Sequence, residues 1–229
     1  MDQAAIARLN AINREFYRVT AHEFDQTRGQ PWPGWERLLN NLTVPLTVLD
    51  VGCGNGRFGV FLNERLHSIT YHGVDSNSTL LDRARKFLPD ARLELRDIVD
   101  DPPDSGAYDL VALFGVMHHI PGAQQRQTFM RQLGERVKPG GLLAFACWRF
   151  YEFERFRQRI VPWPDDFTVE THDYLLDWRR GETALRYCHY VDDAEHAALI
   201  AASGLVEIDT YRADGFSGTV NQYSILKAV

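Results

Sequence analysis

The stretch Leu49-Asp50-Val51-Gly52-Cys53-Gly54-Asn55-Gly56 joins an apolar run, residues 46–51, to a segment with apolar residues at helical spacing, residues 57–62. Because glycine has no Cβ, the three glycines permit positive φ in a tight turn and let a ligand approach the backbone. Polar ligand atoms can then reach the free N–H groups at the start of the following helix. A turn of this kind can also be purely structural. The stretch predicts a strand, a loop and a helix, and a second signal must decide whether the loop holds a ligand.

Asp75 supplies that second signal. It ends the next apolar run, residues 69–74, and lies about 20 residues past the glycines, where a nucleotide-binding sheet holds the ribose hydroxyls. Ser76 follows directly, and either Ser76 or Ser78 can cap the next helix. Together the two signals predict a bound nucleoside cofactor. The residues that we expect around this cofactor are Asp50, Gly52, Cys53, Gly54, Asn55, Gly56, Asp75 and Ser76.

Asp97 follows a third expected strand, residues 91–95, at the edge of the sheet where side chains face the ligand. We interpret its carboxylate as the acceptor for an amine such as the 6-amino group of adenine, with Ile98 against the ring. The alternative is a solvated loop carboxylate in an acidic segment. Phe114 ends the buried run 109–114 and is expected at the same cofactor-binding edge.

Two histidines come just after that fourth expected strand. His118 and His119 lie where chemistry would be expected, and either could act as a base near neutral pH. The alternative is a histidine that only hydrogen-bonds a neighbouring backbone group. Adjacent side chains point in different directions, so we expect at most one of the two to face the pocket.

The order of elements favours an α/β fold. Strands and helices alternate between residues 46 and 148, which predicts a doubly wound, mainly parallel, Rossmann-like sheet covered on both faces. The runs 205–211 and 220–226 are joined by a short turn, so they must pair antiparallel. A seven-stranded sheet that ends in such a hairpin differs from the ordinary dinucleotide-binding fold.

Composition sets the class of protein. The 229 residues, 45% of them hydrophobic, suit one domain, residues 1–229, with a full core. No membrane span and no signal peptide are expected. Three widely spaced cysteines predict neither a metal site nor a disulfide framework and favour a cytoplasmic location. The net charge of −6 argues against holding nucleic acid by bulk electrostatics, although it does not exclude a local basic patch.

Two segments are expected to cover the site. Residues 1–45 form an N-terminal helical cap and lid, in which Arg28 holds an anionic group such as a carboxylate; alternatively Trp32 and Trp35 only cap the core edge. Residues 149–190 form an insertion that acts as a substrate lid. The insertion interleaves aromatic residues with arginines, a mixture that can stack and clamp RNA bases. Its seven arginines face eight acidic residues, so it is not basic overall.

These motifs resemble those of class I S-adenosylmethionine-dependent methyltransferases over essentially the whole chain. Residues 50–56 are similar to that family's cofactor loop, Asp75 to its ribose-binding acid and Asp97-Ile98 to its adenine site. Residues 138–141, Lys-Pro-Gly-Gly, resemble the turn before its fifth strand. The resemblance implies S-adenosyl-L-methionine as cofactor and S-adenosyl-L-homocysteine as product.

A narrower resemblance is to the tRNA wobble-uridine carboxymethyl methyltransferases, including those fused to AlkB-type domains. It implies esterification of a carboxymethyl group on an anticodon uridine, and a small zinc-binding partner subunit. The similar stretches are residues 24–28, 31–33, 50–56, 118–119, 147–148, 161–163 and 186–190. The substrate-side residues that we expect are Trp32, Trp148, Trp163, Arg186, His189 and Tyr190.

Three functions stay open at this point. The first is methyl transfer to RNA, and the second is methyl transfer to an O or N atom of a small metabolite, which the acidic net charge favours. The third is a nicotinamide-dependent oxidoreductase or a non-catalytic cofactor-binding module, against which the closing hairpin speaks. A carboxylate acceptor is already ionised at pH 7 and needs no base, whereas a hydroxyl or ammonium acceptor would make His118 or His119 the natural base.

Overall fold

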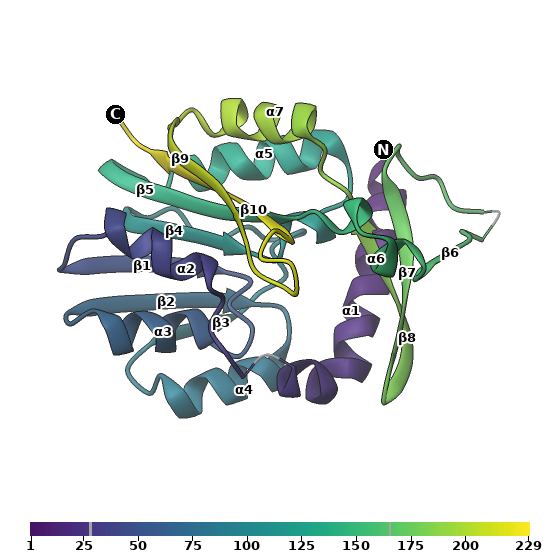
Figure 1. Ribbon diagram of the computed structural model, residues 1–229, viewed down its shortest axis with the longest axis horizontal. Helices are drawn as coiled ribbons and strands as arrows, with labels where there is room; N and C mark the ends of the chain where they lie inside the picture. The colour runs from purple at the N-terminus through teal and green to yellow at the C-terminus, as the bar shows by residue number, and fades with distance from the viewer. Residues whose placement is uncertain (28, 165) are drawn as a thin grey trace.

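Seven strands form the central sheet, in the order β3-β2-β1-β4-β5-β10-β9 (Figure 1). The computed structural model describes residues 1–27, 29–164 and 166–229. Strands β1 to β5 are parallel, whereas β10 is antiparallel to both β5 and β9. The expected fold, a mainly parallel sheet with an antiparallel C-terminal hairpin, is therefore confirmed. The strand bounds are Leu46–Val51 (β1), Ile69–Asp75 (β2), Arg92–Leu95 (β3), Tyr108–Phe114 (β4), Val137–Trp148 (β5), Val206–Ala213 (β9) and Asn221–Lys227 (β10).

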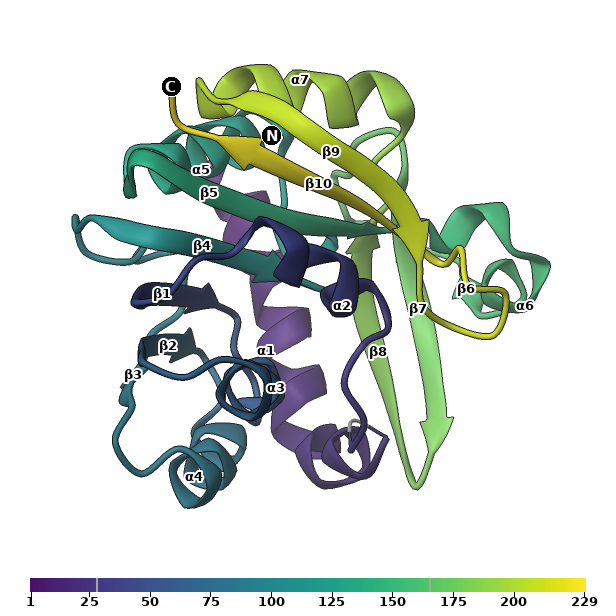
Figure 2. The same ribbon diagram turned by 60° about the vertical axis from the view of Figure 1, so that its left-hand side comes forward.

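Helices cover both faces of this sheet (Figures 1 and 2). On one face, Trp35, Phe61 and Leu81 from three helices belong to a single buried cluster with residues of β1, β4 and β5. On the other face, Met130 and Leu199 pack in a second cluster with residues of the same strands. The first face carries α2 (Gly34–Leu38), η1 (Leu39–Asn41), α3 (Arg57–Arg65) and α4 (Ser78–Phe87), and the second carries α5 (Ala123–Gly134) and α7 (Asp193–Ser203).

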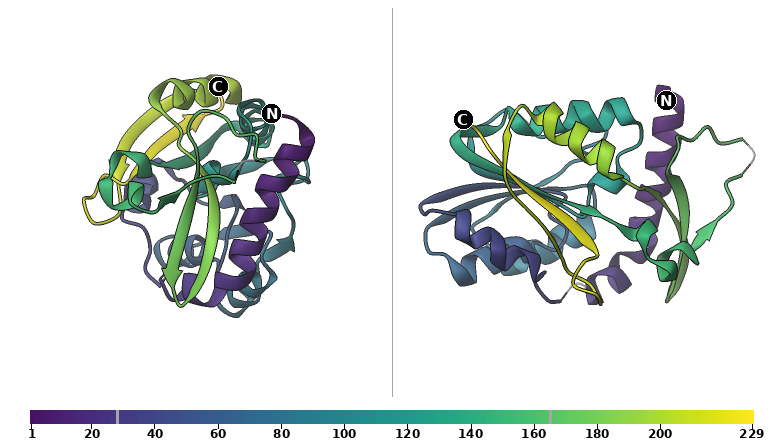
Figure 3. Two further views of the ribbon diagram at one scale, coloured as in Figure 1. Left: turned by 90° about the vertical axis from the view of Figure 1, so that its right-hand side faces the viewer. Right: turned by 45° about the horizontal axis from the view of Figure 1, so that its top comes forward.

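The N-terminal helix α1 (Gln3–Gln26) crosses the end of the sheet at which the parallel strands finish (Figures 1 and 3). Its side chains reach both the loops of the sheet and the insertion, because Asn10 bonds Asp97 in a loop of the sheet and Arg8 bonds Asp166 in the insertion. Of the helices in the described part of the chain, none has both the length and the apolar character needed to cross a membrane.

The insertion folds as a small sheet of its own, in the order β6-β7-β8, on the far side of α1 (Figure 3). Strands β7 and β8 form a long antiparallel hairpin that turns at Gly181, which has a φ of 75°. The hairpin places Arg186 and Trp178 next to α1, where both approach the Phe16 ring. Its elements are η3 (Phe150–Glu152), α6 (Glu154–Arg157), β6 (Ile160–Val161), β7 (Asp173–Arg180) and β8 (Glu182–His189).

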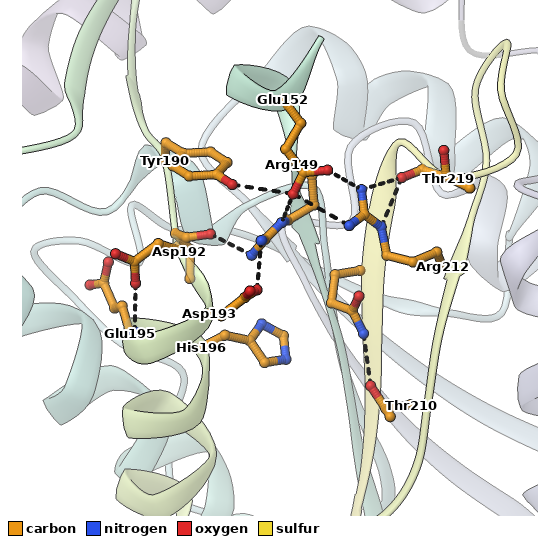
Figure 4. A network of polar contacts seen from close by, with 12 residues as sticks. Arg149, Glu152, Tyr190, Asp192, Asp193, Glu195, His196, Thr210, Arg212 and Thr219 are labelled. Atoms are coloured by element: carbon orange, nitrogen blue, oxygen red, sulfur yellow. Dashed lines mark hydrogen bonds and ion pairs between the residues drawn. The ribbon is translucent and has the colours of Figure 1, made fainter.

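A buried arginine, Arg149, forms hydrogen bonds with residues at both ends of the insertion (Figure 4). Arg149 opens the insertion, and its guanidinium donates to the Val191 carbonyl at 2.8 Å, just past the other end. The same guanidinium bonds Glu152 at 2.7 Å and Asp193 at 2.6 Å. Arg212 of β9 also binds Glu152, at 2.7 Å. This network of charged residues thus connects the insertion to the central sheet.

The largest difference from the expected elements lies before the fifth strand. Helix α5 ends at Gly134, and β5 already begins at Val137, so the Lys-Pro-Gly-Gly stretch that resembles a turn before the fifth strand lies inside that strand. The pairing with β4 shifts between Tyr108 and Leu110, which accommodates the extra residues as an irregularity of the strand. Residues 138–141 therefore belong to the sheet and do not precede it.

Candidate active site

The glycine loop has a backbone that only glycine can follow at its first position. Gly52 has a φ of 76°, and a Cβ added there would lie 2.2 Å from a methyl group of Val116. Gly54 donates its N–H to Asp75 at 2.8 Å. Gly56, with a φ of 77°, starts α3 and packs against α4 rather than facing a cavity. The loop is therefore held open between β1 and α3, with its backbone along the edge of the sheet.

Burial changes the acid strength of the two aspartates beside this loop. Asp50 is 3% exposed, and burial raises its pKa to about 7, although a hydrogen bond from the Tyr71 hydroxyl opposes the change. Burial also raises the pKa of Asp75, against the hydrogen bonds that Asn77 and Gly54 donate to it. A cation bound nearby would stabilise both carboxylates in their charged form.

A first cavity opens along this loop, and most of the residues expected around a cofactor line it. Gly56 is not among the lining residues, and Arg28 falls outside the described residues. The other expected residues, all of which line this cavity, are Asp50, Gly52, Cys53, Gly54, Asn55, Asp75, Ser76, Asp97, Ile98 and Phe114.

Helix α1 closes the first cavity with polar side chains that sequence reasoning missed. Asn10 donates to Asp97 at 3.0 Å, and Arg14 reaches the same carboxylate at 3.3 Å. Asn13 and Tyr17 line the cavity as well. The four residues follow helical spacing on one face of an otherwise amphipathic helix, so this polar stripe was the signal that could have identified them.

A second, larger cavity adjoins the first, and the two share Tyr17, Trp32 and Gly115 as lining residues. The second cavity lies between the end of β5, α6 and the β7–β8 hairpin. Three residues expected on the substrate side, Trp32, Trp148 and Arg186, line it. The aromatic lining residues are Tyr17, Trp32, Trp148, Phe156 and Trp178, and the arginines are Arg155, Arg159, Arg179 and Arg186.

The charges of the second cavity leave a net positive surface. Its acidic residue Asp177 forms ion pairs with Arg159 at 3.7 Å and with Arg179 at 2.5 Å. Its other acidic residue, Asp214, is buried and accepts hydrogen bonds from the Gly34 N–H and from Asn221, each at 2.8 Å. Both negative charges of the lining are therefore engaged by the protein itself.

Arg186 is held by aromatic rings instead of by an acid. Its guanidinium carbon lies 5.2 Å from the centre of the Phe16 ring and 4.9 Å from that of Trp148. Among the described residues, no carboxylate lies within ion-pair distance of it. Stacking of this kind orients a guanidinium without neutralising it. Arg186 therefore presents an uncompensated, positioned charge to the second cavity.

The two adjacent histidines line different cavities. His119 lines the first, and its ring nitrogens meet the Tyr17 hydroxyl at 2.9 Å and the Tyr187 carbonyl oxygen at 3.1 Å. His118 is buried, lines the second cavity and lies edge-on to Trp148. The turn that carries the two histidines lies between the cavities, so each histidine lines one of them and neither lines both.

Three residues expected on the substrate side lie outside both cavities. His189 is buried between Asp173, at 2.7 Å, and Glu195, at 2.6 Å, where both ring nitrogens serve the structure of the insertion. Tyr190 bonds Glu152, and Trp163 bonds the Asp173 carbonyl. Burial alone would lower the pKa of His189, but its two carboxylate partners raise it above the ordinary value. These residues anchor the insertion instead of lining its cavity.

Two clusters in the described part of the chain have the residue types of a metal site, and one of them adjoins the cavities. The ligand atoms of His118, His119 and Cys188 lie within 4.8 Å of one another. The residues do not fit a bound ion well, because both nitrogens of His119 already have hydrogen-bond partners. Burial also raises the pKa of Cys188 to about 11, whereas a metal ligand must be a thiolate.

Residues 49–143, which contain the glycine loop, Asp75 and Asp97, match the family model of a methyltransferase domain. The chain carries a methyltransferase domain. This domain shares its fold with the 1,6-didemethyltoxoflavin-N1-methyltransferase of Burkholderia thailandensis, with a TM-score of 0.68 and 17% identity over 100% of this chain and 92% of that one.

Two curated relatives resemble the methyltransferase domain in sequence. The tRNA (carboxymethyluridine(34)-5-O)-methyltransferase of Saccharomyces cerevisiae is 26% identical over 71% of this chain and 60% of its own length. The tRNA (carboxymethyluridine(34)-5-O)-methyltransferase ALKBH8 of Mus musculus is 31% identical over 58% of this chain and 19% of its own length. The chain thus spans about 60% of the yeast protein and a fifth of the mouse protein.

Proposed function

We propose that the chain is an S-adenosylmethionine-dependent methyltransferase that esterifies an anionic acceptor, the carboxymethyl group of a tRNA wobble uridine. One observation carries this proposal: two cavities of opposite character meet at Tyr17, Trp32 and Gly115. The first is lined by acidic residues and the second by arginines and aromatic rings. A cationic cofactor and an anionic, ring-bearing acceptor would bring their reacting atoms together at that junction.

The first cavity suits a sulfonium nucleoside. Asp75 lies where the ribose hydroxyls of the cofactor would bind, and Asp97 with Ile98 lies where its adenine would bind. The carboxylates of Asp50, Asp75 and Asp97 supply negative charge that favours a cofactor with a sulfonium and an ammonium group. The residues present fit S-adenosyl-L-methionine, which supplies the activated methyl group.

The second cavity suits a nucleobase that carries a carboxylate. Arg186 is oriented for such a carboxylate by two rings, and a planar guanidinium binds carboxylates in a bidentate manner. Trp32, Trp148 and Trp178 offer surfaces on which a flipped-out base can stack. The relatives named above support this acceptor, because their names state that they act on carboxymethyluridine in tRNA.

The rate of methyl transfer then depends on how the protein aligns the methyl donor and the acceptor. Methyl transfer is a direct displacement, so the protein has to hold donor and acceptor in line at short distance. A carboxylate is ionised at pH 7 and needs no base, which agrees with the engagement of both His119 nitrogens by Tyr17 and Tyr187. We expect the double variant His118→Gln, His119→Gln to slow ester formation without abolishing it. Complete loss of turnover with intact cofactor binding would contradict the scheme without a base.

The proposal is tested by methyl transfer from labelled S-adenosylmethionine to tRNA that contains carboxymethyluridine. The control is the same tRNA without the carboxymethyl group. The resemblance also implies a small zinc-binding partner subunit, so the assay is run with the chain alone and with such a subunit co-expressed. We expect a labelled methyl ester, cleaved by mild base, only with the carboxymethylated tRNA. Labelling of free carboxylic acids but not of tRNA would show a metabolite methyltransferase instead.

Binding measurements distinguish the proposed methyltransferase from the remaining alternative, a nicotinamide-dependent oxidoreductase. An oxidoreductase would bind NAD in the first cavity, whereas the acidic lining favours the cationic S-adenosylmethionine. Calorimetric titration of the chain with each cofactor is expected to show binding of S-adenosylmethionine and none of NAD. The reverse result would overturn the proposed function.

A further inference from the structure

The turn between β9 and β10 presents an aromatic side chain to solvent. Phe216 lies in this turn and is 59% exposed. Three residues of the same turn have a positive φ: Asp214 at 68°, Gly215 at 70° and Gly218 at 70°. This conformation is strained for a residue with a Cβ, so the aspartate at position 214 has to be held by its surroundings. Strain that a protein maintains in this way often marks a turn with a function.

Hydrogen bonds hold both ends of the turn in place. At its start, the Asp214 carboxylate accepts a hydrogen bond from the Gly34 N–H at 2.8 Å. At its end, Nε of Arg212 donates to the Thr219 carbonyl oxygen at 2.8 Å (Figure 4). A side chain on a turn that is held at both ends has a defined position relative to the sheet. The exposed ring of Phe216 is therefore a fixed feature of the surface.

The Phe216 ring borders the second cavity. The turn lies beside α6 (Figure 2), where the Phe216 ring meets the ring of Phe153 edge to face, with centres 5.5 Å apart. The centre of the Phe156 ring is 6.4 Å away. Phe156 and Gly215, the neighbour of Phe216 in the chain, both line the second cavity. A single exposed aromatic ring needs no explanation, but this ring extends the aromatic lining of a cavity to the outside of the protein.

Arg155 adds a positive charge at the same border. Its guanidinium carbon lies 4.5 Å from the centre of the Phe216 ring and 5.2 Å from that of Phe156, and Arg155 itself lines the second cavity. The acidic residues near it in the chain have other partners, because Glu152 binds two other arginines and Glu154 accepts a hydrogen bond from a glutamine. Within the described ranges, no carboxylate lies within ion-pair distance of Arg155. Its charge is therefore available to an anionic ligand.

We propose that Phe216 and Arg155 bind the nucleotide next to the one whose base occupies the second cavity, with the ring stacked on its base and the guanidinium against its phosphate. This inference rests on the proposed function, because it requires an RNA acceptor in the second cavity. A nucleotide of an RNA stays joined to its neighbours through phosphates, so the RNA chain has to continue past the border of the cavity. An exposed aromatic ring beside an arginine is a combination with which proteins bind single-stranded RNA.

Acceptors of different length test the stacking contact. The methyl-transfer assay compares the carboxymethyluridine nucleoside with an anticodon stem-loop RNA that contains it. Phe216→Ala is expected to lower kcat/KM for the stem-loop about tenfold, through KM, as loss of one base stacked on an aromatic ring would. The value of kcat/KM for the nucleoside should be unchanged, because a nucleoside has no neighbour to stack on Phe216. Phe216→Trp keeps an aromatic surface and should retain the activity of the wild type on the stem-loop.

Arg155→Gln tests the phosphate contact separately. This variant should bind the stem-loop more weakly, and the slope of log affinity against log salt concentration should become shallower by about 0.7, the value for one phosphate contact on a single strand. Fluorescence anisotropy of a labelled stem-loop at several salt concentrations measures the slope. A slope equal to that of the wild type would contradict the contact between Arg155 and a phosphate.

Matched controls lie away from both cavities. Phe87 of α4 is 67% exposed, Arg131 of α5 has no ion pair in the described part of the chain, and neither residue lines a cavity. Phe87→Ala and Arg131→Gln should behave as the wild type with both acceptors. Equal losses of Phe216→Ala on the stem-loop and on the nucleoside, or no loss relative to Phe87→Ala, would overturn the inference while leaving the proposed function intact. A wild-type chain that methylates neither acceptor would overturn both.

Discussion

The two cavities of this methyltransferase domain differ in how they are built. The first lies along the glycine loop and the ends of β1, β2 and β4, and its shape follows from backbone conformation, such as the positive φ of Gly52. The second lies between that sheet edge and a separate hairpin, and its character follows from side chains such as Arg186. A cavity shaped by backbone conformation suits a cofactor that many proteins share. A cavity shaped by the side chains of an insertion can take a different acceptor in a different protein.

The largest effect that tests this comparison is expected from Gly52→Ala. A Cβ at this position would overlap a methyl group of Val116 at 2.2 Å, in addition to the strain of a φ of 76°. We expect cofactor affinity to fall by about a thousandfold or more, since the loop or the Val116 side chain must move by about 1 Å to relieve this contact. Calorimetry with S-adenosylmethionine measures this loss.

Gly218→Ala is the matched control for that variant. Gly218 has a φ of 70°, but an added Cβ there would meet no atom within 4 Å. It should cost about 1 kcal/mol of folding free energy through backbone strain, with unchanged cofactor affinity. If Gly52→Ala bound the cofactor as Gly218→Ala does, backbone shape would not define the first cavity.

The next largest effect is expected from Arg186→Met, which removes the charge but keeps most of the side-chain volume. We expect kcat/KM for the anionic acceptor to fall about 100-fold, because a positioned charge opposite a carboxylate is lost. The affinity for S-adenosylmethionine should be unchanged, because Arg186 lines only the second cavity. Arg186→Lys should recover a part of the activity. Equal loss of cofactor binding in Arg186→Met would show that the two cavities are not independent.

A third test concerns the anchor of the insertion. His189→Gln removes the charge-assisted bonds to Asp173 and Glu195 and should lower the free energy of unfolding by about 2 kcal/mol. The raised pKa of His189 means that its stabilisation is fully present below the pKa of the unfolded chain, about 6.5, and is lost as pH rises through the folded value.

At low pH, protonation of Glu195 limits the stabilisation that the bonds of His189 provide. Burial would raise its pKa, but its bonds to His189 and Arg126 lower it, so its contribution is lost as pH falls through the folded value. The difference between wild type and variant should therefore be largest between about pH 4.3 and 6.5, the unfolded values of the two groups. Urea unfolding at several pH values measures it. A difference that does not vary with pH would mean that His189 is held as a neutral side chain.

The smallest effect is expected from the ionisation of Asp50. Because burial raises its pKa to about 7, affinity for the cationic S-adenosylmethionine should increase, by less than about tenfold, as pH rises through that value. Asp50→Asn should flatten this dependence. S-adenosylhomocysteine lacks the sulfonium charge and should show a weaker dependence. Equal pH profiles for the two ligands would place the sulfonium far from Asp50.

The sequence predicted the first cavity far better than the second, for a physical reason. A loop with three glycines and an acid about 20 residues later are local patterns, and residues such as Asp75 and Ile98 lie where a parallel sheet must place them. Tyr17 and Asn10 were missed because their role depends on α1 crossing the sheet, which is a tertiary contact. In the insertion, Arg186 lines the second cavity but His189 does not. Alternation along β8 sends neighbouring side chains to opposite faces, and sequence similarity alone could not assign the faces.

The most direct test of the account is a crystal structure with S-adenosylhomocysteine and a carboxymethyluridine nucleoside bound together. We predict the ribose of the cofactor product at Asp75, the carboxylate of the nucleoside within hydrogen-bond distance of Arg186, and the two reacting ends beside Tyr17 and Gly115. A cofactor product bound away from Asp75, or a nucleoside carboxylate that does not approach Arg186, would contradict the central claim that these two cavities are the donor and acceptor sites of one reaction.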